Sequence, residues 1–80
     1  MTVGEAVQLR ILELCRERDL SINKLSTLSG VTQSTVNNIV SGRNNSTTVS
    51  TIQKVCDGLD MDLATFFSGE LFSRNEQEIR

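Results

Sequence analysis

Residues 20–42, which read LSINKLSTLSGVTQSTVNNIVSG, constrain the fold more than any other part of this chain. Apolar side chains recur there in steps of three and four residues, which is the spacing of one face of an α-helix. Gly30 interrupts the pattern, and glycine enters the left-handed backbone region of a tight turn without steric cost. Thr32 follows with a hydroxyl suited to cap a new helix. The segment therefore predicts two short helices, at about residues 22–29 and 33–41. Their apolar positions are Ile22, Leu25, Leu28, Val31, Val36, Ile39 and Val40.

The second of these helices has outward positions that are polar but uncharged, namely Gln33, Ser34, Asn37 and Asn38. Their side chains both donate and accept hydrogen bonds, as the edges of nucleic-acid bases do. Asparagine is a poor residue for a helix interior, and solubility alone would favour Glu or Lys. The pattern therefore favours a surface for an anionic partner, and a merely solvated helix face is the alternative.

The spacing resembles the helix-turn-helix of the Cro and phage-repressor family, also called lambda-repressor-like or XRE-type. In that pattern a small residue on the first helix is followed four positions later by the glycine of the turn, and Ser26 and Gly30 occupy these slots. The resemblance extends over roughly residues 7–67. It implies an all-α, five-helix DNA-binding domain at residues 1–67 that acts as a transcriptional regulator, followed by a tail at residues 68–80.

The resemblance also implies a set of DNA-contacting residues. In the family the second helix of the motif lies in the major groove, and the base-contacting positions correspond to Gln33, Ser34 and Asn38, with Asn37 beside them. Gln or Asn pairs with adenine through two hydrogen bonds. Phosphate contacts are expected at the start of the first motif helix, on the second motif helix (hereafter the reading helix, about residues 33–41) and in the loop after it. That loop also fits a simple polar turn. The residues are Ser21, Asn23, Thr35, Arg43, Asn44 and Asn45.

Two departures from the family pattern are informative. Many members pair an Arg late in the first helix with a Glu near the end of the reading helix, where this chain has Cys15 and Val40. Exchanging both halves of a buried ion pair for apolar groups is often tolerated, so we expect Cys15 and Val40 to approach each other. Many members also begin the first motif helix with a phosphate-binding Gln, where this chain has Ile22.

Charge is distributed unevenly along the chain. The formal net charge is −2, but residues 20–56 contain no Asp or Glu and carry Lys24, Arg43 and Lys54. A locally positive segment on an acidic chain suits a surface that faces phosphates. Three charges are few, so a merely neutral polar segment explains this distribution equally well.

The remaining helices are predicted from apolar spacing and from residues that end helices. A helix at about residues 3–18 would point Glu13 and Glu17 outward beside Arg10 and Arg16. Asp19 and Asp60 would take left-handed positions that often hold glycine, and Gly42 would end the reading helix. Later helices would start after Thr48 and Asp62. The inward residues are expected to be Val7, Ile11, Leu14 and Cys15, then Val49, Ile52, Val55, Cys56 and Leu59, then Leu63, Phe66 and Phe67.

The tail from residue 68 leaves three alternatives open. Leu71 and Phe72 would pack on the domain as part of a short helix, form a contact in a dimer, or anchor an otherwise frayed end.

Several classes of protein are disfavoured. The chain has no histidine to serve as a base for Cys15 or Cys56, and it has no phosphate-binding glycine loop, so we do not expect an enzyme. No metal and no cofactor are expected. A cytoplasmic location is expected, because no signal peptide or membrane span is visible. The two cysteines are then expected to be reduced thiols in the core, and a disulfide or redox switch is the alternative.

The leading hypothesis is a regulator that binds double-stranded DNA, as a homodimer at least on DNA, because one small domain reads only a few base pairs. The alternative is an antitoxin-like module that uses the same fold to hold a partner protein, for which the acidic segment at residues 70–80 is the candidate surface.

Overall fold

The computed structural model describes residues 2–42 and 47–73, and these residues form helices and no strands. The all-α fold predicted from the sequence is confirmed, with a short sixth helix after the five that were expected. The helices are α1 (Val3–Glu17), α2 (Ile22–Ser29), α3 (Gln33–Val40), α4 (Val49–Gly58), α5 (Leu63–Phe66) and α6 (Glu70–Ser73).

The first turns of helices α1 to α5 are capped by hydroxyl and carboxylate side chains. The Ser21 side chain accepts a hydrogen bond from the backbone N–H of Lys24, and Thr32 accepts one from Thr35. Such caps satisfy N–H groups that have no partner inside the helix. The caps predicted at Ser21, Thr32, Thr48 and Asp62 are all present.

Left-handed residues end the helices where the sequence placed them. Gly30 and Gly42 have φ angles of 73° and 80°, and Asp19 and Asp60 have φ angles of 57° and 59°. The prediction that aspartate would stand in for glycine at two helix ends is therefore confirmed.

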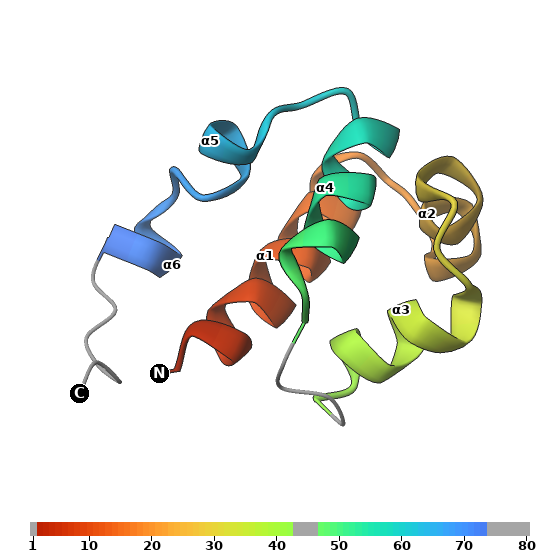
Figure 1. Ribbon diagram of the computed structural model, residues 1–80, viewed down its shortest axis with the longest axis horizontal. Coiled ribbons are helices and arrows are strands. Elements are labelled where there is room, and N and C mark those ends of the chain that lie inside the picture. The colour runs from red at the N-terminus through yellow and green to blue at the C-terminus, as the bar shows by residue number, and fades with distance from the viewer. Residues whose placement is uncertain (1, 43–46, 74–80) are drawn as a thin grey trace.

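The helices surround one apolar core. Helices α2 and α3 lie on one side of α1 and α4, whereas α5 and α6 lie on the other side (Figure 1). Helix α1 packs against α3 and α6, and α4 packs against α2 and α5. The buried core consists of Val7, Ile11, Leu14, Cys15, Leu25, Val31, Val36, Ile39, Ile52, Val55, Cys56, Leu59 and Phe66.

Three expectations about burial are wrong. Val49 was expected to face inward but is 65% exposed, and Phe67 is 36% exposed beside the fully buried Phe66. Helical spacing defines a face but does not tell how far the neighbouring element extends, and Val49 is the first residue of its helix. Arg10 was expected to point outward, yet its side chain is only 11% exposed. It is drawn inward because its guanidinium donates to the carbonyl groups of Phe66 and Thr65 at the end of α5, at 2.8 and 3.2 Å.

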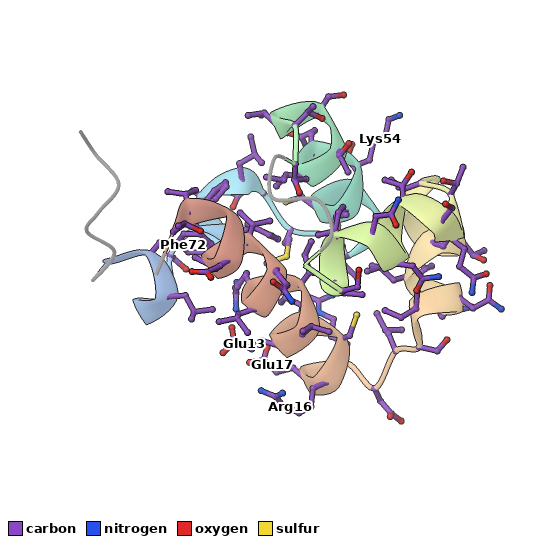
Figure 2. The ribbon with its side chains drawn as sticks, turned by 90° about the horizontal axis from the view of Figure 1, so that it is seen from below. Glu13, Arg16, Glu17, Lys54 and Phe72 are labelled. Atoms are coloured by element: carbon purple, nitrogen blue, oxygen red, sulfur yellow. The ribbon has the colours of Figure 1, made fainter. Side chains whose placement is uncertain are left out.

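The segment after α5 packs on the domain. The ring of Phe72 on α6 lies 4.8 Å from that of Phe67 and 6.2 Å from that of Phe66, between ring centroids. Figure 2 shows Phe72 beside α1. The structure thus favours the first of the three alternatives for Leu71 and Phe72, both of which are half-buried.

The two cysteines are free and buried, as expected for core thiols. Burial raises the pKa of the Cys15 thiol. Burial also raises the pKa of Cys56, with a further contribution from the charges of Asp57 and Asp62. Both side chains therefore favour the neutral thiol.

Across the described residues, none of the helices combines the length and the apolar character that a membrane crossing requires.

Candidate nucleic-acid interface

The orientation of α3 follows from its buried residues. Val36 and Ile39 are almost completely buried in the core. Since side chains three residues apart share one face of a helix, fixing these two turns the opposite face outward. That outer face carries Gln33, Ser34 and Asn37, all exposed, and the half-buried Asn38.

These four side chains line one surface. Together with Val40 and Ser41 they border a shallow, open depression along the outside of α3. Of the residues that the structure describes, none receives a hydrogen bond from the side chains of Gln33, Ser34, Asn37 or Asn38. Within the described part of the chain, these amide and hydroxyl groups donate to no other group, and they suit a ligand that offers both donors and acceptors. The structure gathers the four predicted base-contacting residues, and their contact with bases stays a prediction.

The turn between α2 and α3 is held by short polar contacts. Ser26 occupies the small position of the motif, and its hydroxyl donates to the carbonyl oxygen of Val31 directly beyond the turn. Ser29 is buried and its hydroxyl donates to the carbonyl of Leu25 at 2.7 Å. Both hydroxyl groups are thus satisfied locally, which allows serine to lie between two closely packed helices.

The start of α2 presents exposed backbone and polar side chains. Ser21 and Asn23 are exposed, and the Ser21 oxygen accepts from the N–H of Lys24 at 3.0 Å. A helix N-terminus carries partial positive charge and attracts phosphate groups. Ile22 is instead half-buried and packs against the core. Its side chain has no polar group for a phosphate, so any such contact here falls to its neighbours.

Thr35 is less exposed than Ser21 and Asn23, which are also predicted to contact phosphates. It is half-buried, and its hydroxyl oxygen accepts from the hydroxyl of Thr32 at 2.8 Å. Arg43, Asn44 and Asn45 lie outside the described residues, so their predicted phosphate contacts have no structural account here.

Charge is separated in space as well as along the sequence. Figure 2 shows Lys54 of α4 at one edge of the molecule and Glu13, Arg16 and Glu17 of α1 at the opposite edge. Glu13 forms an ion pair with Arg10 at 2.7 Å, on the α5 side of the domain. Glu13 and Glu17 thus lie away from the edge that carries Lys54. Helices α2 and α3 and the first eight residues of α4 carry no acid.

Sequence reasoning missed Gln8, a half-buried residue on α1. Its side-chain Nε2 donates to the carbonyl oxygen of Val40, the last residue of α3, at 2.8 Å. A signal was present, since Gln8 lies three residues before Ile11 and seven before Cys15, at the border of the apolar face of α1. A polar residue at such a border often bonds to a neighbouring element.

These features are those of a known class of DNA-binding domain. Residues 10–70 match the family of the Cro/C1-type HTH (helix-turn-helix) DNA-binding domain. The chain belongs to this family. A crystal structure of the prophage Lp1 protein 11 is similar to it, with 38% identity, a TM-score of 0.79, and coverage of 92% of this chain and 97% of that chain. No curated protein was found to match the chain.

In this Cro/C1-type domain, α2 and α3 lie where the sequence predicts the helix-turn-helix. Cys15 lies in the core, and Val40, its expected neighbour, packs at the margin of the core. Both residues belong to one apolar assembly, and their direct approach stays a prediction.

Proposed function

We propose that this protein is a transcriptional regulator that recognises a specific sequence of double-stranded DNA. Helix α3 enters the major groove, where Gln33, Ser34 and Asn38 contact base edges and Asn37 contacts a base or a phosphate. Ser21, Asn23, Thr35, Arg43, Asn44 and Asn45 contact the backbone.

The observation that carries this proposal is the outer face of α3. Its four side chains are neutral, can donate and accept, and border one open surface on a helix that bears no acid. Base edges in the major groove present mixed donors and acceptors, which neutral amides match in pairs. The phosphates on either side of the groove would repel carboxylates, so the lack of acids fits the same partner.

We further propose that two copies bind together. The eight residues of α3 reach only a few base pairs. Useful discrimination in a genome requires more contacts than one such helix makes. Two copies on half-sites about 34–36 Å apart, one helical turn of DNA, would double the number of bases read.

Selection from a random library of double-stranded DNA tests both parts of the proposal. The purified protein is mixed with the library at moderate salt, and bound duplexes are recovered, amplified and sequenced over several rounds. Enrichment of a short palindrome with adenines in each half is the expected outcome. Binding to a duplex that carries a single half-site should then be weaker than binding to the full palindrome.

No enrichment by a protein shown to be folded would contradict sequence-specific binding. It would favour the module that holds a partner protein instead. Enrichment of a single, non-palindromic half-site would retain sequence-specific binding and contradict the dimer.

A further inference from the structure

We propose that Gln8 is a positioning residue, which anchors the end of α3 and thereby sets where Asn37 and Asn38 lie in the groove. This inference rests on the proposed function for its effect on base reading. The anchoring itself is a property of the free protein and is tested without DNA.

The last four carbonyl groups of a helix have no partner inside it. At the end of α3, the backbone N–H of Ser41 donates to Asn37 at 3.0 Å, and that of Gly42 donates to Ile39 at 3.2 Å. The hydroxyl of Ser41 donates to the carbonyl of Asn38 at 3.3 Å. Three of the four carbonyls are thus satisfied by the two residues that follow the helix.

The fourth carbonyl, that of Val40, accepts a hydrogen bond from another helix. Within residues 2–42 and 47–73, the donor that reaches its oxygen is Nε2 of Gln8, at 2.8 Å. The contact is partly buried and joins residues 32 positions apart. Breaking a partly shielded hydrogen bond between two helices has a free-energy cost, so this contact resists displacement of α3 relative to α1.

A second observation places the same side chain against the residue beyond the helix. A Cβ atom built on Gly42 would lie 3.5 Å from Oε1 and 3.7 Å from Nε2 of Gln8. The amide of Gln8 therefore lies flat along the left-handed turn that ends α3, where Gly42 has a φ angle of 80°. Gln8 thus bonds to the last carbonyl of the helix and lies beside the turn that follows it.

The anchored end is part of the candidate reading surface. Val40 and Ser41 border the same depression as Gln33, Ser34, Asn37 and Asn38. A shift at Val40 therefore moves one end of that surface relative to α1. Cys15 of α1 lies in the apolar core and Val40 of α3 packs at its margin, so the Gln8 amide adds a polar link between helices that otherwise share apolar packing. A hydrogen bond has a preferred direction, whereas apolar packing tolerates small rotations.

The test compares Gln8→Met with the wild type. Methionine has nearly the same length and no donor. Its matched control is Gln53→Met, which removes a glutamine amide that bonds to Asp57 of its own helix, at 2.8 Å, and leaves α3 untouched. Gln8→Lys restores a donor to the carbonyl, and a cation at a helix C-terminus is electrostatically favourable.

The first measurement is amide hydrogen exchange in the free protein. Gln8→Met should speed exchange at Ser41 and Gly42 by about fivefold or more, the loss of one hydrogen bond, beyond any change at Leu59 of the α4 end. Gln8→Lys should restore slow exchange, and Gln53→Met should leave Ser41 and Gly42 as in the wild type. Equal acceleration at Ser41, Gly42 and Leu59 would show only a loss of global stability and would overturn the anchoring role.

The second measurement is the ratio of affinities for the selected duplex and for a scrambled duplex of equal length, below the melting temperature of every variant. Gln8→Met should lower this ratio about fivefold while binding to the scrambled duplex is retained, because the phosphate-contacting residues are unchanged. An unchanged ratio beside accelerated local exchange would overturn the link to base reading. Should the wild type select no duplex at all, the proposed function fails, and the exchange result alone decides whether Gln8 anchors α3.

Discussion

Single side chains at helix ends decide much of the local structure of this protein. Thr32 and Thr48 each accept a backbone N–H three residues ahead, and Asp19 and Asp60 adopt left-handed conformations. Each of these roles depends on a few neighbouring residues and on the size and polarity of one side chain. That is why the sequence alone predicted them.

The cap of α5, Asp62, makes the stability of the domain depend on pH. Hydrogen bonding from Thr65, first through its side chain and then through its backbone N–H, lowers the pKa of Asp62 below its ordinary value of 3.8. The ionised form is thus favoured by folding. The stabilisation is present above pH 3.8 and is lost as the pH falls through the lowered pKa of the folded state.

We expect Asp62→Asn to remove this dependence. Asparagine still caps a helix but does not titrate, so the variant should be slightly less stable than the wild type near neutral pH. The difference should shrink as the pH is lowered below 3.8, the ordinary pKa of Asp62. Urea unfolding followed by circular dichroism from pH 7 to pH 2.5 measures it. Parallel stability curves for the two proteins would contradict the prediction.

Gln33 is the residue expected to read a base at the first turn of α3. Gln33→Ala should lower discrimination at one position of each half-site by about 1–3 kcal/mol, because the bidentate contact is lost. Fluorescence anisotropy with duplexes that vary at each position measures the effect. Gln53→Ala on α4 is the control and should leave base preference unchanged. Equal losses for all four bases at every position would argue that Gln33 does not read sequence.

At the scale of elements, side chains of α1 and of Arg18, the residue after it, donate hydrogen bonds to carbonyl groups at the C-terminal ends of three other helices. Its Gln8 donates to Val40 of α3, and its Arg10 donates to Phe66 and Thr65 at the end of α5. Arg18, which follows the helix, donates to the carbonyl of Leu59 beyond α4 at 2.6 Å. Carbonyl groups that the helices cannot satisfy internally are thereby paired. This shared role explains why Arg10 is largely buried.

The packing of α4 against α2 depends on the absence of a side chain at one point. A Cβ atom on Gly58 would lie 2.6 Å from the backbone oxygen of Leu28. The added Cβ would be fixed to the backbone of α4, and the oxygen it meets belongs to the backbone of α2. No flexible side chain is therefore available to move away. The sequence reading gave Gly58 no role, since nothing in local spacing shows that another helix passes so close.

Gly58→Ala should therefore destabilise the domain, by roughly 1–3 kcal/mol as in other overpacked cores. Gly69→Ala is a matched control, because a Cβ at Gly69 meets no atom of the described residues within 4 Å. Chemical unfolding of both variants measures the free energy of unfolding. A Gly58 variant as stable as the control would show that α2 and α4 separate at little cost.

For the whole molecule, the distribution of charge predicts how salt affects DNA binding. Arg43→Ala should weaken binding to all duplexes and reduce the steepness of log K against log salt by about one unit, because one phosphate contact is lost. Arg16→Ala is the control, since Arg16 is exposed on α1 at the edge opposite Lys54 (Figure 2) and should leave the slope unchanged. A slope that is equally steep in the Arg43 variant would remove Arg43 from the phosphate contacts.

The two buried thiols report on the stability of the whole domain. Cys15 and Cys56 are free and have pKa values raised by burial, so a thiol reagent requires opening of the core. Native protein at pH 8 should react about 100-fold or more slowly than protein unfolded in urea, as a stability of about 3–5 kcal/mol implies. Absorbance of the released thiolate product gives the two rates. Comparable rates would indicate that the core opens readily.

The sequence by itself determined where helices begin and end, which face of each is apolar, and that α3 carries a neutral polar face. These properties depend on residues within a few positions of one another, so spacing and side-chain chemistry suffice to predict them. It also led to the family, which the match over residues 10–70 confirms. The predicted DNA contacts remain predictions.

Only the tertiary structure decided which polar residues of α1 would bond to other helices and which apolar residues would remain exposed. Gln8 and Val40 are joined although 32 positions separate them, whereas Val49 is exposed although it continues the apolar spacing of α4. Both outcomes depend on the distance to a neighbouring helix. Such distances are set by the packing of the whole core, and a pattern read along one helix contains no information about them.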